Sequence, residues 1–189
     1  MFRDLLVREF SPYGRLRASQ LDQLEEHYGL LRTWNQKLNL TRIQSVEDAV
    51  RLHYCESLFL ARELPAGSLR IADIGSGGGF PGIPIAVFRP ECMVTLIESH
   101  QRKGVFLREA SRRLVNVTVV ASRAESAPDG FDWAVSRGVS PARVILAKPA
   151  RNLALLAAAG ISAAAGPGCS VQKLPWGERR VIVFQAEQA

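Results

Sequence analysis

The sequence has few of the residues and segments that mark secreted, zinc-binding or membrane proteins. Cysteine occurs only three times, at widely spaced positions and never as a Cys-x-x-Cys pair. That pattern supports neither a disulfide framework nor a zinc site. The longest apolar stretch, residues 153–165, is interrupted by a glycine and a serine and is too short to cross a bilayer as a helix. The first residues include charged ones rather than an apolar leader, so we expect a cytoplasmic protein without a bound metal.

The chain has no excess of negative charge, and residues 70–189 have a clear excess of positive charge. Residues 1–69 hold nine basic and nine acidic side chains, whereas residues 70–189 hold fifteen basic and nine acidic ones, which accounts for the net charge of +6. Concentrated positive charge suits a polyphosphate partner such as a nucleic acid. The twenty arginines outnumber the four lysines, a ratio that favours forked phosphate contacts but that a GC-rich genome also produces. The basic residues that we consider candidate nucleic-acid contacts are Arg102, Lys103, Arg112 and Arg113.

Helical periodicity dominates the first third of the chain. Apolar residues recur at steps of three and four between residues 21 and 38, and Ser19-x-x-Asp22 resembles a capping box before them. A second helix is expected to begin at the Ser45-x-x-Asp48 motif and to end near residue 64, where a Pro-Ala-Gly sequence follows. Residues 1–66 are therefore predicted to form an N-terminal helical extension.

From residue 67 onward, strand-like and helix-like segments alternate. This succession predicts an α/β fold with a mainly parallel sheet and helices on both faces, so residues 67–189 are expected to form one Rossmann-like domain. The last two strands have no helix between them and are expected to form an antiparallel hairpin around residues 175–177, after a loose loop at residues 161–168. The expected strands are residues 69–74, 93–98, 117–121, 131–136, 153–158, 170–174 and 179–185. The expected helices between them are residues 81–88, 101–114 and about 141–149.

The segment DIGSGGGFPG at residues 73–82 indicates a nucleotide-type cofactor loop, because it directly follows an apolar strand-like run. Its glycines leave the backbone without Cβ atoms, so a ligand can approach closely. The dinucleotide-binding pattern requires a third glycine at the position where this chain has Phe80. The pattern Asp73-x-Gly75-x-Gly77-x-Gly79 instead matches the loop used by S-adenosylmethionine-dependent methyltransferases.

Acidic residues near this loop favour S-adenosylmethionine over a nicotinamide cofactor. Loops that bind phosphates normally offer helix N-termini and basic or neutral groups, whereas the sulfonium and ammonium groups of S-adenosylmethionine are compatible with carboxylates. Asp73 lies at the loop, Glu98 ends the next strand-like run 23 residues past Gly75, and Glu125 follows the third run. The position of Glu98 is close to that of a ribose-binding acid in a βαβ unit. For Asp73 and Glu125 a helix-capping or loop-capping role stays open as an alternative.

Four motifs resemble those of one bacterial family. They are WNxxxNLT at residues 34–41, HxxES at 53–57, DIGSGGGFPGIP at 73–84 and FDxxxSR at 131–137. Through them the chain, from about residue 30 to 184, resembles the glucose-inhibited division protein B family, the ribosomal small-subunit methyltransferases G. The resemblance implies a class I S-adenosylmethionine-dependent methyltransferase fold and methyl transfer to N7 of a guanine in 16S ribosomal RNA. Glu56 replaces the family's aspartate, and the segments after Arg137 and from Gly160 are shorter than usual, which bears on RNA affinity rather than on cofactor binding.

The resemblance also implies cofactor-binding residues, while the catalytic residue stays unassigned. The matching positions are Gly75, Phe80, Glu98, Ala124, Glu125 and Arg137. Guanine N7 has its own lone pair, so no general base is required. His53 is a candidate either for RNA contact or for packing at the domain junction. Trp176, in the expected hairpin turn, is a candidate for base stacking or for covering the sheet edge.

Three functional hypotheses follow from these patterns. The first is an S-adenosylmethionine-dependent methyltransferase that acts, as a monomer and away from membranes, on 16S ribosomal RNA or on the small ribosomal subunit. The second keeps the cofactor but has a protein or a small molecule as acceptor. The third is a non-catalytic RNA-binding or assembly factor with the same fold, because a fold does not determine a function.

Overall fold

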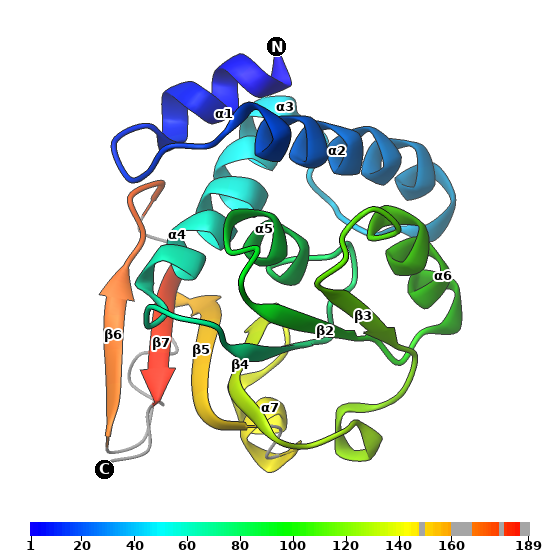
Figure 1. Ribbon diagram of the computed structural model, residues 1–189, viewed down its shortest axis with the longest axis vertical. Helices are drawn as coiled ribbons and strands as arrows, with labels where there is room; N and C mark the ends of the chain where they lie inside the picture. The colour runs from blue at the N-terminus through cyan, green and yellow to red at the C-terminus, as the bar shows by residue number, and fades with distance from the viewer. Residues whose placement is uncertain (148–149, 160–167, 178–179, 186–189) are drawn as a thin grey trace.

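A seven-stranded sheet forms the centre of the protein in the computed structural model (Figure 1). The structure describes residues 1–147, 150–159, 168–177 and 180–185. The strand order is β3-β2-β1-β4-β5-β7-β6. The strands are β1 (Arg70–Ile74), β2 (Met93–Ile97), β3 (Val117–Val120), β4 (Phe131–Arg137), β5 (Ala150–Ala158), β6 (Cys169–Lys173) and β7 (Arg180–Gln185).

Parallel pairing joins β3, β2, β1, β4 and β5, as the alternation of strands and helices predicts. β7 pairs antiparallel with both β5 and β6, which confirms the expected C-terminal hairpin. The loop predicted at residues 161–168 lies outside the described residues, except for Gly168. Because the parallel strands all end at one edge of the sheet, that edge is the expected place for a ligand; we call it the carboxyl edge.

Helices lie on both faces of the sheet, but most of the described ones cover one face (Figure 1). Side chains alternate along each strand, so Ile71 and Val135 belong to a large core under these helices. Their neighbours Ala72 and Ala134 belong to a smaller core with Val144 of α7. The helices are α1 (Phe2–Phe10), α2 (Ala18–Leu38), α3 (Val46–Ala49), α4 (Glu56–Glu63), α5 (Gly82–Phe88), α6 (Gln101–Ala110) and α7 (Pro141–Ala147), with a π-helical turn η1 (Val50–Cys55) and a 3₁₀ turn η2 (Ala124–Ser126).

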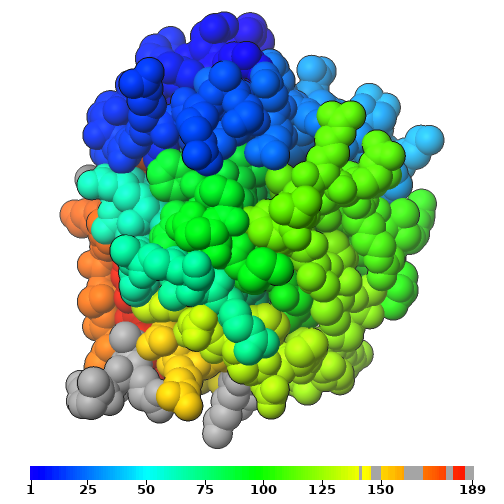
Figure 2. Space-filling model, viewed as in Figure 1, coloured from blue at the N-terminus to red at the C-terminus, as the bar shows by residue number. Residues whose placement is uncertain are grey.

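The N-terminal helices share the large core with the sheet. Phe2 and Phe10 of α1 and Leu24 and Leu31 of α2 are buried in the same cluster as Phe106 of α6. In the space-filling view of Figure 2 the N-terminal segment covers one end of the α/β part directly. The boundary expected at residue 66 therefore marks a change of secondary structure within one continuous core, and a division into two domains stays a prediction.

Two predicted helix ends differ from the structure. α2 begins at Ala18, before the supposed capping box at Ser19. The side chain of Gln20 fixes this start, because it accepts a hydrogen bond from Arg17 N (2.9 Å) and donates one to Val87 O (2.8 Å), a tertiary contact that the local pattern does not contain. α6 ends at Ala110, four residues early, where the hydroxyl of Ser111 donates to the carbonyl of Leu107 (2.7 Å).

Candidate active site

The glycine loop between β1 and α5 has a shape that only glycine adopts without strain. Gly75, Gly77 and Gly79 have φ angles of 70°, 54° and 86°. Backbone bonds close the loop, because Gly75 N donates to Ile97 O (2.8 Å) and Gly79 N donates to Ser76 O (2.7 Å). The loop is thereby tied to the end of β2, at the carboxyl edge where the sequence pattern predicts the cofactor.

Asp73 lies completely buried beneath this loop. Its Oδ2 accepts a hydrogen bond from Gly82 N at the start of α5 (3.0 Å), so its side chain caps this helix, which is the alternative role that the sequence left open for Asp73. Its Oδ1 is buried and has no hydrogen-bond partner among the described residues. Burial raises the pKa of this carboxyl group to about 7, although the bonds from Gly82 and Ser76 oppose the shift. Asp73 therefore fixes the turn from β1 into α5 and keeps one acceptor unused.

Glu98 holds the other side of the loop. Its side chain follows β2 and is 7% exposed. Oε2 accepts a hydrogen bond from Gly77 N (3.0 Å), and Oε1 accepts one from His100 N (2.8 Å). A carboxylate has about four lone-pair sites, so each oxygen can accept one further bond. Glu98 thus orders the glycine loop and still has acceptor capacity for ligand hydroxyl groups.

A hollow of about 300 Å³ opens at the carboxyl edge beside these groups. It brings together Gly75, Ala124 and Glu125 of the predicted cofactor residues, and Ile97 of β2 also lines it. Ala124 and Glu125 reach it from η2, which follows β3. Glu125 is exposed and makes no hydrogen bond among the described residues. Its carboxylate therefore faces solvent at the mouth of the hollow rather than capping the short helix.

Phe80 and His53 pack against each other behind the loop. Phe80 is 5% exposed and His53 is 3% exposed. Their rings are stacked, with centroids 4.5 Å apart and an interplanar angle of 13°. His53 Nε2 is also hydrogen-bonded to Thr41 Oγ1 (2.7 Å). Of the two roles expected for His53, the structure supports packing, and the ring of Phe80 supports the loop from inside the protein.

Arg137 joins the end of β4 to the helical segment opposite. Its Nη2 donates to the carbonyl oxygen of Leu52 (2.7 Å), and its Nε lies 3.6 Å from Glu56 Oε2. The Glu56 side chain is 2% exposed, so this is a buried ion pair. Leu52 belongs to η1, and π-helical turns occur often at functional sites. Glu56, the residue that departs from the family pattern, is thus paired with Arg137. A contact between Arg137 and the cofactor stays a prediction.

The basic candidates on and after α6 lie at two different edges of the sheet. α6 begins at the carboxyl edge, where Gln101 contacts Ala121 just past β3, so Arg102 and Lys103 lie on the cofactor side. Arg112 and Arg113 follow the end of α6 and lie near the starts of the strands, at the opposite edge. Both also face carboxylates: Arg112 lies 3.8 Å from Glu109, and Arg113 lies 3.0 Å from Glu26. The four residues therefore do not form one surface.

A buried pair that the sequence patterns did not single out supports the same loop. His27 Nε2 is 3.0 Å from Gly78 O, and His27 Nδ1 is 2.8 Å from Tyr54 Oη. A carbonyl oxygen only accepts, so Nε2 has the proton and Nδ1 accepts from the tyrosine. Burial lowers the pKa of His27 to about 4, which keeps the ring neutral. The sequence does contain one sign of this buried pair, because His27 comes three residues after Leu24, inside the apolar stripe of α2.

Trp176 covers hydrophobic surface. Its ring lies 5.0 Å from that of Tyr13 and 5.9 Å from that of Phe59, so it packs the turn after β6 against the N-terminal helices.

Within the described ranges, no group of three or more His, Cys, Asp or Glu side chains could hold a metal ion. In the same ranges, no helix has the length and apolar character needed to cross a membrane.

Comparison with known proteins shows which family has this sequence pattern. The model of the family described as rRNA small subunit methyltransferase G matches residues 20–159. The chain belongs to this family. A ribosomal RNA small subunit methyltransferase G from Halorhodospira halophila is 42% identical over 135 residues, which are 69% of this chain and 63% of that protein. One from Acetivibrio thermocellus is 33% identical over 150 residues, 78% of this chain and 62% of that protein. The chain thus spans less than two thirds of the length of these relatives.

Solved structures with low sequence identity share the fold. A protein from Corynebacterium glutamicum aligns with a TM-score of 0.58, 17% identity and 98% coverage of both chains. A SAM-dependent methyltransferase from Aquifex aeolicus aligns with a TM-score of 0.55 and 15% identity over 72% of this chain and 91% of that one. Aeropyrum pernix fibrillarin with bound S-adenosylmethionine aligns with a TM-score of 0.52 and 16% identity over 68% and 72%. The predicted class I methyltransferase fold is confirmed.

Proposed function

We propose that the protein transfers a methyl group from S-adenosylmethionine to N7 of a guanine in 16S ribosomal RNA. The observation that supports this best is the position of Glu98, bonded to the glycine loop at the carboxyl edge, in a chain of the methyltransferase G family. We further propose that it acts in the cytoplasm, because its RNA substrate is found there, and that it acts as a monomer.

The residues of the carboxyl edge fit S-adenosylmethionine. A Cβ atom on Gly77 would meet only Gly75 O, at 3.7 Å, so the concave side of the loop is open to a ligand. Glu98 offers unused lone pairs to ribose hydroxyl groups. The hollow is lined by charges of both signs, Glu125 on one hand and Arg123 and Arg143 on the other, so it can hold a zwitterionic ligand such as S-adenosylmethionine. When bound, the cofactor supplies an activated methyl group on its sulfonium.

The protein's own contribution to the reaction is alignment. Guanine N7 is nucleophilic through its own lone pair, so no side chain has to remove a proton. Holding N7 about 3–3.5 Å from the methyl carbon, in line with the bond that breaks, lowers the barrier by several kcal/mol because the search for the right orientation is avoided. Carboxylates are best kept away from the sulfur, since they would stabilise its charge before transfer. The bonds from Gly77 and His100 to Glu98 hold its carboxylate at the loop.

Binding of the cofactor is tested with Gly77→Val. At φ 54° a branched side chain is strained by about 1–2 kcal/mol, and it would also fill the open side of the loop. Gly67→Val is the matched control, because Gly67 has φ 102° and open space around it but lies before β1, at the opposite edge of the sheet from the loop. Calorimetry should show S-adenosylmethionine binding to the wild type and to the control, and no binding to Gly77→Val. Tighter binding of NAD to the wild type would contradict the proposal.

The acceptor is tested by following a radiolabelled methyl group. Wild-type protein is incubated with methyl-labelled S-adenosylmethionine and a mixture of small-subunit ribosomal RNA, ribosomal protein and small metabolites. Label is expected in the RNA, as N7-methylguanosine. Label in the protein or small-molecule fraction would identify a different acceptor, and cofactor binding without transfer to any fraction would favour a non-catalytic factor.

A further inference from the structure

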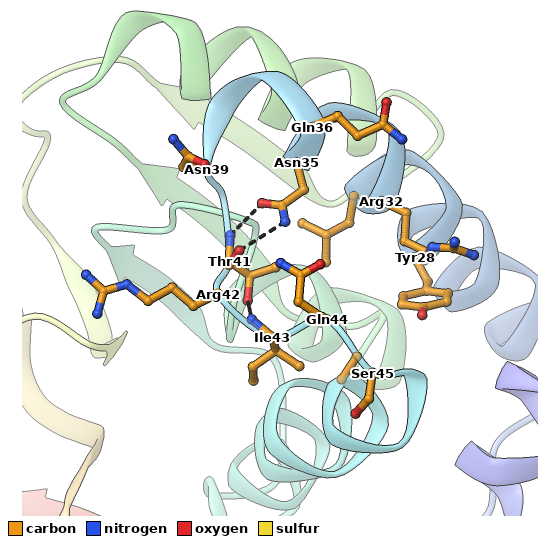
Figure 3. A pocket seen from close by; sticks show the side chains of 12 residues that line it. Tyr28, Arg32, Asn35, Gln36, Asn39, Thr41, Arg42, Ile43, Gln44 and Ser45 are labelled. Carbon is orange, nitrogen blue, oxygen red and sulfur yellow. Dashed lines mark hydrogen bonds between the residues drawn. The ribbon is translucent and has the colours of Figure 1, made fainter.

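The WNxxxNLT motif builds a loop of fixed shape between α2 and α3 (Figure 3). The Asn35 side chain forms two bonds with the backbone of Thr41: its Nδ2 donates to Thr41 O (3.0 Å), and its Oδ1 accepts from Thr41 N (2.8 Å). Asn39 adopts the left-handed conformation, with φ 48°, which asparagine tolerates better than most residues. Thr41 Oγ1 accepts a bond from Ile43 N (3.0 Å). The motif residues therefore stabilise the loop itself.

This loop encloses a hollow of about 710 Å³, which we call the motif hollow. Its described lining contains four side-chain amides and two arginines but no carboxylate. Arg32 lies over the ring of Tyr28, 5.9 Å from its centroid, and Arg42 makes no ion pair within the described ranges. Figure 3 shows the two guanidinium groups on opposite sides of the loop. Two arginines without an ion pair in the described part of the chain, one on each side of a loop that presents hydrogen-bonding amides, favour an anionic ligand with polar edges.

The motif hollow lies at the same edge of the molecule as the cofactor loop. α2 begins beside the end of α5, where Gln20 bonds to Val87, and it runs toward the carboxyl edge, where His27 bonds to Gly78. Leu31, which lines the motif hollow, is one turn further on and would lie 3.1 Å from a Cβ atom on Gly78. The motif hollow and the hollow at the carboxyl edge have no lining residue in common among those described. Gly75 lines the hollow at the carboxyl edge and Leu31 of the motif hollow lies against Gly78, so the two hollows border different parts of the glycine loop.

We propose that the motif hollow binds a nucleotide of the RNA substrate that flanks the acceptor guanine; this inference rests on the proposed function. The volume is within the range of small-molecule sites, so a nucleotide fits. Arg32 and Arg42 bind its phosphates, and the amides of Gln36 and Gln44 bind the edge of its unpaired base. The flanking position follows from the separation between the two hollows. The bonds that shape the loop keep this subsite preformed.

The test removes the two charges without touching the residues that shape the loop. Arg32→Ala/Arg42→Ala is compared with Arg15→Ala/Lys37→Ala, which removes the same charge from exposed side chains outside the motif hollow. The substrate is a 16S ribosomal RNA transcript, and the steady-state KM and kcat of methyl transfer are measured. Thermal unfolding and calorimetry with S-adenosylmethionine verify that each variant is folded and binds the cofactor.

We expect the KM for RNA to rise about tenfold or more in Arg32→Ala/Arg42→Ala, since each lost contact involves a charged group. Its kcat and its cofactor affinity should stay within twofold of wild type, and the control should match wild type in all values. Equal KM values for the two double variants would overturn the subsite while leaving the proposed function intact. A wild type that binds S-adenosylmethionine but methylates no RNA would overturn the proposed function and the subsite together.

Discussion

The replacement Glu98→Gln separates a loop-ordering role from a surface position. Glu98 accepts one backbone N–H on each oxygen, from Gly77 and from His100. A glutamine side chain has one oxygen and one NH₂ group, so in either orientation one of these N–H groups loses its acceptor and faces a second donor. Because the group is 7% exposed, water replaces the lost bond poorly. Losing a hydrogen bond to a charged group costs roughly 1.5–3 kcal/mol.

The replacement Glu98→Gln should lower the stability of the protein through the lost hydrogen bond and weaken cofactor binding through the lost charge. For a chain of this length the unfolding temperature falls by about 2–4 °C per kcal/mol, so a decrease of about 3–12 °C is expected for the ligand-free Glu98→Gln variant. The same variant also loses the charge that would face the ribose hydroxyl groups. Its affinity for S-adenosylmethionine should therefore fall by about tenfold or more. Differential scanning calorimetry and isothermal titration calorimetry measure the two effects on one preparation.

Glu125→Gln is the matched control for Glu98→Gln. Glu125 lines the carboxyl-edge hollow but is exposed and makes no hydrogen bond in the described part of the chain. Its replacement should leave the unfolding temperature of the ligand-free protein unchanged. If Glu98→Gln unfolds at the wild-type temperature and binds the cofactor with wild-type affinity, Glu98 neither orders the loop nor binds the ligand, and the reasoning is refuted.

Two further predictions concern the buried histidine and the basic residues. The folded-state pKa of His27 is about 4, below the ordinary value of 6.5, so the unfolded chain binds a proton that the folded protein does not, and stability rises with pH between these values by about 3 kcal/mol. Urea unfolding of wild type and His27→Phe from pH 4 to 7.5 should show their stability difference increasing by that amount up to pH 6.5; a constant difference would mean that His27 has the same pKa in the folded and the unfolded protein. For RNA, Arg102→Ala/Lys103→Ala should flatten the salt dependence of binding by about 1.4 in logarithmic slope, at about 0.7 per phosphate contact. Arg112→Ala/Arg113→Ala, at the opposite edge, should flatten it less, and the reverse order in a fluorescence-anisotropy titration would assign the RNA surface to that edge.

The architecture follows from local sequence signals. Alternation of apolar strands and helices predicts the parallel sheet, and the missing helix before the last strand predicts the antiparallel hairpin. Ser45 predicts a helix start that the structure confirms, since its side chain accepts from Asp48 N (3.0 Å). The start of α2 is missed because Gln20 combines a local bond from Arg17 N with bonds to Val87 and Phe88, which are 67 and 68 positions away in the chain. No local pattern contains the two distant contacts.

The site is predictable in its glycines and acids but not in its supports. The glycine pattern reveals positions where positive φ angles are required, and Glu98 follows from strand spacing. The bond from His27 to Gly78 and the pairing of Arg137 with Glu56 depend on how the N-terminal helices pack over the sheet. The two parts of the basic cluster look contiguous in sequence, yet α6 spans from one edge of the sheet to the other and separates them.

The central claim is most directly tested by mapping N7-methylguanine in 16S ribosomal RNA from cells with and without this chain. Chemical cleavage at N7-methylguanosine locates the base, and mass spectrometry of RNA digests measures its occupancy. One guanine should be methylated in the presence of the wild-type chain, and unmethylated both in its absence and when the chain has Gly77→Val. An identical methylation pattern in all three strains would contradict the account.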